Sequence, residues 1–186
     1  MYHVAARAPE GELLFLDDHD FARFESGVER ILSPDCTCVA ACALNTHYHL
    51  LLQVEDGVLA VAVHLLNSRY AAAYKLRYGK RGHTFGERYM SVPVESDEQL
   101  MTVYRYVMRN PVEAGLCAEP AEWQWSSYRS AIGLDGRFSF ADPSSVIACF
   151  DGSVPRLREF VETPWESDRT TVLSSGARPS TAQRSC

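Results

Sequence analysis

The chain has 186 residues, which is enough for one well-buried domain and too few for two of ordinary size. Its 46% hydrophobic and 23% charged residues exclude a disordered or fibrous protein, and its formal net charge of -6 excludes one that coats nucleic acid by overall positive charge. No apolar run approaches the roughly 20 residues of a membrane span. The first residues lack the pattern of a signal peptide, so we expect a cytosolic protein with no membrane partner.

The first part of the chain alternates between strand-like and helical patterns. Residues 1–8 open a strand, and apolar side chains at spacings of three and four then predict a helix that begins near residues 17–20 and stops at 33–34. Residues 36–44 and 47–54 are rich in strand-forming residues, and they can pair as a hairpin through Asn45 and Thr46.

A long helix is predicted over residues 59–78, ending at Gly79, followed by a short strand within 85–94 and a helix over 97–110. Pro111 predicts a kinked or restarted turn over 110–115. The order β-α-β-β-α-β plus further helices is typical of an α+β, ferredoxin-like fold. In this split βαβ arrangement an antiparallel sheet carries helices on one face.

The last part of the chain carries weaker signals. Short helices are predicted over residues 127–132, 144–150 and 155–162, and the polar residues from 163 onward show no periodicity. We therefore expect a first unit over 1–133, a C-terminal helical extension over 134–162 and a disordered tail over 163–186.

His47 and His49 share one face of the predicted strand 47–54, with their side chains about 6.5 to 7 Å apart. Two neutral imidazoles at this spacing form part of a site for a divalent metal ion and leave positions open for a third ligand, water and a phosphate oxygen. Two ordinary histidines packed on a sheet would give the same short pattern.

The predicted helix 97–110 presents an apolar stripe that includes Tyr104. Tyr106 lies roughly 130° from the centre of that stripe, and Asn110 follows it one turn later on the same flank. A phenol held beside a metal-bound phosphate can attack it in line. An aromatic side chain on a solvent flank is the alternative interpretation of Tyr106.

A basic strip lies between residues 69 and 88, a segment that contains six positively charged side chains and one acidic side chain, that of Glu87. Cations interleaved with aromatic rings are typical of single-stranded nucleic-acid binding, although Tyr70 and Tyr74 fit packing against a sheet slightly better. The candidate DNA-binding residues are Arg69, Lys75, Arg77, Lys80, Arg81 and Arg88.

Four segments in this order resemble the HUH single-tyrosine transposases of bacterial insertion sequences, and within them the REP-associated tyrosine transposase branch. The segments read NTHYHLLL from Asn45, GHTFGERY from Gly82, YVMRNPVEAGL from Tyr106 and WSSY from Trp125. The resemblance covers residues 1 to 133 and implies a transposase-like catalytic domain there.

The resemblance also implies roles for individual residues. His47 and His49 would bind Mg²⁺ or Mn²⁺, with the side-chain oxygen of Asn110 as the third ligand. Tyr106 would attack a DNA phosphate and form a 5′-phosphotyrosine intermediate while a 3′-hydroxyl leaves. The expected substrate is single-stranded or hairpin DNA, and a monomer and a homodimer are both compatible with the sequence.

Two other functions stay open at this stage. The same sheet and basic strip would suit a single-stranded nucleic-acid-binding module without catalysis. A metal-dependent hydrolase of small phosphoesters would need a base to activate water but no tyrosine adduct.

Overall fold

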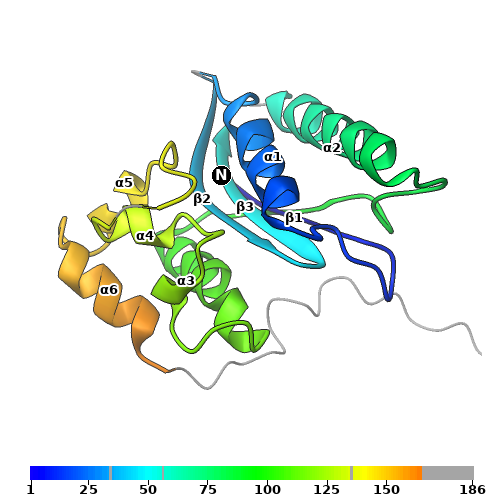
Figure 1. Ribbon diagram of the computed structural model, residues 1–186. Coiled ribbons are helices and arrows are strands. Elements are labelled where there is room, and N and C mark those ends of the chain that lie inside the picture. Colours follow the sequence, from blue (N-terminus) through cyan, green and yellow to red (C-terminus); the bar gives the residue numbers. More distant parts are fainter. Residues whose placement is uncertain (34, 56, 135, 165–186) are drawn as a thin grey trace, which may run out of the picture.

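A computed structural model describes residues 1–33, 35–55, 57–134 and 136–164 (Figure 1). In chain order its elements are β1 (Tyr2–Arg7), α1 (Asp18–Glu29), β2 (Cys36–Leu44), β3 (His47–Val54), α2 (Val58–Tyr78), β4 (Met90–Pro93), α3 (Asp97–Glu113), the 3-10 helix η1 (Pro120–Glu122), α4 (Tyr128–Ala131), α5 (Ser144–Ala148) and α6 (Val154–Glu162).

The four strands form one sheet in the order β2-β3-β1-β4, and every neighbouring pair is antiparallel. Helix α1 connects β1 to β2 across β3, and helix α2 connects β3 to β4 across β1. This is the split βαβ arrangement, so the predicted α+β, ferredoxin-like fold is confirmed. The two central strands, β1 and β3, carry the residues of the candidate site.

Helices cover both faces of the sheet (Figure 1). Helices α1 and α2 pack on one face, where the side chains of Tyr48, Leu50 and Leu52 on β3 meet them, as predicted for the two crossover helices. Leu51 points to the opposite face and packs in a second core with α3, α5 and α6. Because successive side chains of a strand alternate between faces, His47 and His49 lie on the α3 face.

The tyrosine row of α2 belongs to the first core. Tyr70 and Tyr74 are buried, and their hydroxyls donate to the carbonyl oxygens of Leu14 at 2.6 Å and Leu13 at 3.0 Å. The packing interpretation of these two residues is confirmed, and they are not available for stacking on bases.

The outer edge of β2 is covered by the segment that follows η1. The backbone N–H of Ala43 donates to the carbonyl of Trp125, and the N–H of Ser127 donates to Ala41, both at 2.9 Å. The hydroxyl of Ser127 accepts from the N–H of Ala41 at 3.0 Å. The WSSY segment therefore satisfies backbone groups of an edge strand that would otherwise be open to another chain.

Helix α3 is longer than predicted. It continues through Pro111 to Glu113, so the predicted kink or restart over residues 110–115 is wrong. A proline this close to the end of a helix removes only one of the last hydrogen bonds. The helix ends at Glu113, with Ala114 as its C-cap. Gly115 follows, and its φ of 70° permits a Schellman motif in which the N–H of Leu116 donates to Pro111 and that of Gly115 to Val112.

The C-terminal helices pack on α3. Arg109 donates to the backbone carbonyls of Val161 at 2.9 Å and Glu162 at 3.2 Å, and Arg105 donates to the carbonyl of Thr163. Two guanidinium groups thus satisfy the free carbonyls at the end of α6, where positive charge also suits the helix dipole. The predicted tail over 163–186 lies, from residue 165 onward, outside the described residues.

None of the helices in the described part of the chain combines the length and the apolar character that crossing a membrane requires.

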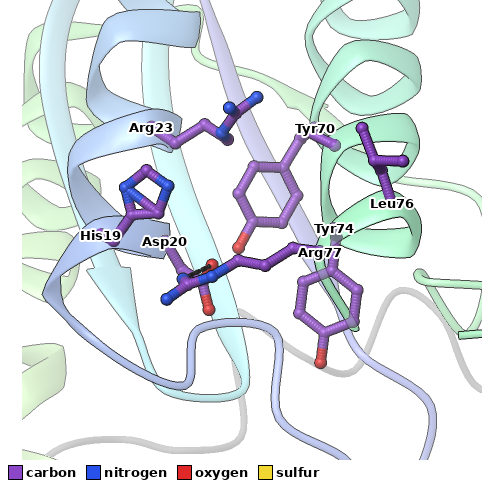
Figure 2. Close-up of a pocket in the computed structure, with 8 residues that line it drawn as sticks. His19, Asp20, Arg23, Tyr70, Tyr74, Leu76 and Arg77 are labelled. Atoms are coloured by element: carbon purple, nitrogen blue, oxygen red, sulfur yellow. Dashed lines mark hydrogen bonds and ion pairs between the residues drawn. The ribbon is translucent and has the colours of Figure 1, made fainter. Parts of the chain in front are cut away.

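A cluster of charges joins α1 to α2 next to a hollow between the two helices (Figure 2). Arg77 of α2 contacts Asp17 at 2.6 Å and Asp20 at 2.7 Å, and the hydroxyl of Tyr78 donates to Asp20 at 2.8 Å. The hydrogen bond from Arg77 lowers the pKa of Asp17 to about 2. Asp17 is also the N-cap of α1, where it accepts from the N–H groups of His19 and Asp20.

This cluster predicts a pH-dependent part of the stability. A carboxyl whose pKa is lower in the folded state stabilises the fold above its ordinary pKa near 4, and this contribution is lost as the pH falls toward 2. Asp17→Asn retains an oxygen for the helix cap but removes the charge. We expect the variant to unfold at lower urea concentration than the parent at pH 7, with the difference vanishing near pH 2. A difference that is the same at pH 7 and pH 2 would contradict the ion pair.

Candidate active site

The candidate site lies on the face of the sheet that α3 covers, across the two central strands. In the antiparallel register of β1 and β3, Arg7 lies opposite His47, Ala5 opposite His49 and His3 opposite Leu51. Directly opposite side chains on one face lie about 4.5 to 5.5 Å apart at Cβ. The register therefore adds Arg7 and His3 to the two histidines predicted from the sequence.

His49 is buried and contacts His3 from the neighbouring strand. Its Nδ1 lies 3.0 Å from Nε2 of His3, and the two rings stack with centroids 5.1 Å apart. The other nitrogen of His49, Nε2, is buried and has no hydrogen-bond partner among the described residues. A buried polar atom without a partner is costly unless it binds something else.

His47 is held from both sides of its ring. Its Nδ1 lies 2.9 Å from the hydroxyl of Thr46, and its Nε2 lies 3.1 Å from Oδ1 of Asn110 on α3. Because an amide oxygen only accepts, Nε2 of His47 donates in this contact. A hydroxyl can donate or accept, so Thr46 can support either tautomer of His47.

Tyr106 and Asn110 point toward the histidines from α3, as the helical spacing predicts. The ring of Tyr106 meets that of His49 nearly perpendicularly, with centroids 5.3 Å apart, and that of His3 at 6.0 Å. Burial raises the pKa of the Tyr106 phenol, and hydrogen bonding with Asn110 acts in the opposite direction. The structure thus brings the predicted nucleophile and all three predicted metal ligands to one place.

A cavity of about 310 Å³ opens beside these side chains. It is lined by residues of β1, β3, α3 and the segment before β4, namely His3, Ala5, Ala6, Arg7, His47, His49, Glu87, Arg88, Met90 and Tyr106. The volume is at the lower end of the range for small-ligand pockets.

Residues 82–89 reach the cavity because they are fixed to β1. The N–H of Gly86 donates to the carbonyl of Arg7 at 3.0 Å, and a Cβ at Gly86 would lie only 3.0 Å from Cα of Pro9. This close approach favours glycine. The strand predicted within 85–94 is β4, which covers Met90–Pro93. The same close approach also places Glu87 and Arg88 at the cavity wall.

The three histidines of the site are held in the neutral form. Burial lowers the pKa of His3 to about 4, that of His47 below its usual value, and that of His49 well below it. Arg7 acts in the same direction on His47 and His49. At neutral pH each ring keeps a lone pair, which is the form that binds a metal ion.

The donors present fit a divalent metal ion. Two imidazole nitrogens and one amide oxygen meet here, and Nε2 of His49 has a lone pair with no partner among the described residues. Nε2 of His47 would become a metal donor once its proton moves to Nδ1, where the hydroxyl of Thr46 can accept it. Among the described residues no group of three or more His, Cys, Asp or Glu side chains is arranged to hold a metal. The third protein ligand would thus have to be the amide of Asn110.

The basic strip is divided by the fold. Of its six residues only Arg88 lines the cavity, whereas Arg69, Lys75 and Arg77 lie on α2, which packs on the opposite face of the sheet. Arg77 is paired with Asp17 and Asp20, and Lys80 with Glu12. Arg69, Lys75 and Arg81 are exposed.

Comparison with solved structures finds a similar fold. One match is described as the "Structure of the REP associates tyrosine transposase bound to a REP hairpin", with a TM-score of 0.61 and 12% sequence identity over 70% of this chain and 78% of that chain. The resemblance inferred from the four sequence segments is confirmed at the level of the fold. No protein-family model and no curated protein matches the sequence.

Tyr104 occupies a different environment from Tyr106. It is fully buried in the core between the sheet and the C-terminal helices, and its hydroxyl has no hydrogen-bond partner among the described residues. Burial raises its pKa far above the usual range.

This difference predicts the effect of Tyr104→Phe on stability. Removing an unpaired buried hydroxyl relieves a desolvation cost, so we expect the free energy of unfolding to stay the same or rise by about 1 kcal/mol. Urea denaturation measures it, with Tyr70→Phe as the control, because that variant loses the 2.6 Å hydrogen bond to Leu14 and should be destabilised by about 1 kcal/mol. A clear loss of stability in Tyr104→Phe would show that its hydroxyl has a partner.

Proposed function

We propose that this protein cleaves and rejoins single-stranded or hairpin DNA through a covalent bond between Tyr106 and a DNA phosphate. The observation that supports the proposal best is the position of the Tyr106 ring, whose centroid is 5.3 Å from that of His49 at a cavity that also contains His47 and Arg88. The likeness in fold to a REP-associated tyrosine transposase bound to a REP hairpin supports the same class of substrate.

In the proposed reaction the phenol oxygen of Tyr106 attacks a backbone phosphorus of the bound strand. A bond forms between phosphorus and the phenol oxygen, the bond between phosphorus and the 3′-oxygen breaks, and the 3′-oxygen takes up a proton to leave as a hydroxyl. The phenol gives up its proton in this step, and the segment downstream of the break stays attached to Tyr106 through its 5′-phosphate as a phosphotyrosine. Attack by a 3′-hydroxyl on this ester reverses the sequence and rejoins a strand.

The residues around Tyr106 would prepare it for this step. Hydrogen bonding with Asn110 opposes the effect of burial on the phenol pKa and so favours loss of the proton. Arg7 and Arg88 supply positive charge at the cavity wall for the phosphate. Contact with the rings of His3 and His49 limits the orientations of the phenol.

His47, His49 and Asn110 would hold Mg²⁺ or Mn²⁺. When bound, the cation would neutralise charge on the scissile phosphate and help to draw the proton from the phenol.

A covalent adduct tests the proposal directly. We expect the protein, incubated with labelled hairpin-bearing single strands and Mg²⁺, to form a DNA adduct that survives denaturation, and we expect Tyr106→Phe to abolish it. Tyr104→Phe is the matched control, since its ring lies two residues away on the same helix but in the core. An adduct that persists in Tyr106→Phe would refute the assignment of the nucleophile. Strand binding with no adduct in the parent would identify a binding module instead.

The divided basic strip predicts unequal effects on DNA binding. Arg88→Ala should weaken the binding of a single strand and reduce the slope of log Kobs against log salt by about 0.7, the value for one lost phosphate contact. Arg69→Ala, on the opposite face of the sheet, should leave the slope unchanged. Fluorescence anisotropy at several salt concentrations measures both variants, and equal losses would place the DNA on both faces.

A further inference from the structure

We infer that His3 is a positioning residue: its Nε2 accepts a hydrogen bond from Nδ1–H of His49 and so keeps Nε2 of His49 deprotonated and directed at the metal site. The inference deepens the proposed function and relies on its metal site. His3 thereby gains a role in the site, in addition to the roles proposed for the histidine pair, Tyr106 and Asn110.

His3 and His49 form a buried contact between two neighbouring strands. His3 is almost fully buried, with 1% of its surface exposed, and lies on β1, the strand that pairs with β3. Its Nε2 is 3.0 Å from Nδ1 of His49, which is a normal hydrogen-bond distance. Two neutral imidazoles can form this bond in two ways, depending on which ring donates.

The direction of this hydrogen bond determines whether Nε2 of His49 carries a proton. If His3 donates, Nδ1 of His49 is the acceptor and the proton of His49 sits on Nε2, where it would be buried with no acceptor among the described residues. If His49 donates, its Nε2 carries a lone pair, which a metal ion can use. A buried N–H without an acceptor is costly, and only the second direction yields a ligand, because a metal cannot bind a protonated nitrogen.

His47 differs from His49 in the partner of its Nδ1. The Nδ1 of that ring contacts the hydroxyl of Thr46 on the protein surface, and a hydroxyl accepts both tautomers. His49 lies deeper, and among the described residues its Nδ1 has a hydrogen-bond contact only with the ring of His3. The tautomer of the buried ligand therefore depends on one partner, as is common for histidine ligands whose second nitrogen donates to a fixed acceptor.

His3 also touches the proposed nucleophile. Its ring meets that of Tyr106 edge-on at 6.0 Å while it stacks on His49. A purely spatial role would be filled by any flat ring of similar size, whereas the proposed role needs an acceptor atom at the position of Nε2. Two substitutions separate these requirements. His3→Phe keeps the ring and removes the acceptor, and His3→Gln removes the ring but offers an amide oxygen near the position of Nε2.

The first measurement is the affinity for Mn²⁺ alone, by titration calorimetry or by electron paramagnetic resonance of the free ion. We expect His3→Phe to lose 10- to 100-fold in affinity, the usual range for a lost partner of a metal ligand, and His3→Gln to recover most of it. The control is His64→Phe, an exposed histidine on α2, which should bind Mn²⁺ like the parent. Equal affinities of His3→Phe and the parent, or no recovery in a folded His3→Gln, would overturn the role.

The second measurement needs no metal and separates this inference from the proposed function. Long-range proton–nitrogen correlation spectra identify the protonated nitrogen of each imidazole. We expect the His49 proton on Nδ1 in the parent and in His3→Gln, and a shift toward Nε2 in His3→Phe. A parent with the proton on Nε2 refutes the inference, even if it binds Mn²⁺. A parent that binds no Mn²⁺ but carries the Nδ1 proton refutes the metal site and leaves the His3 contact supported.

Discussion

Burial of imidazoles on the inner face of a packed sheet is the constraint on which this site depends. A polar ring removed from water needs a partner for each nitrogen, and β3 places His49 where the nearest partners belong to β1 and α3. The antiparallel register of β1 and β3 meets part of that need with His3, and α3 meets the need of His47 with Asn110. Among the described residues Nε2 of His49 stays buried without a partner, and the ring of Tyr106 meets the ring of His49 with centroids 5.3 Å apart.

The rest of the fold fixes the elements that satisfy this constraint. One side of helix α3 faces the site, because Tyr106 and Asn110 are one turn apart on it. A neighbouring side carries Arg105 and Arg109, also one turn apart, and contacts α6. Gly86 holds the segment before β4 against β1 and so brings Arg88 to the cavity. The site is therefore assembled from three contacts between segments distant in the sequence. These are the pairing of β1 with β3, the contact of Asn110 on α3 with His47, and the hydrogen bond of Gly86 with Arg7.

Local patterns were sufficient for much of this arrangement. Strand alternation placed His47 and His49 on one face, and the period of the α-helix set Tyr106 apart from Tyr104. The limits of β2 and β3 follow from strand-forming residues on either side of Asn45 and Thr46. The continuation of α3 beyond Pro111 could not be predicted in this way, because proline usually indicates the end of a helix. The Schellman motif that ends the helix lies a few residues later, at Gly115.

His3 and the division of the basic strip needed information that no local pattern holds. The sequence distance between His3 and His49 is 46 residues, and only the pairing of β1 with β3 brings them together. Likewise, Arg69 and Arg88 belong to one run of positive charge in the sequence, but the chain leaves α2 and crosses to the far edge of the sheet between them. A signal was present at His3, a polar side chain in a strand-like run, but its partner depended on register.

The attachment of α6 to α3 depends on side chains of α3 and on the main chain of α6. Arg109 donates hydrogen bonds to the main-chain carbonyl oxygens of Val161 and Glu162. Every amino acid has this carbonyl, whatever its side chain. These two hydrogen bonds therefore do not depend on the side chains at the two positions, although the side chain of Val161 is itself buried in the core. A substitution at the end of α6 that keeps the helix and a buried apolar side chain at position 161 leaves both hydrogen bonds in place, whereas replacing Arg109 removes them.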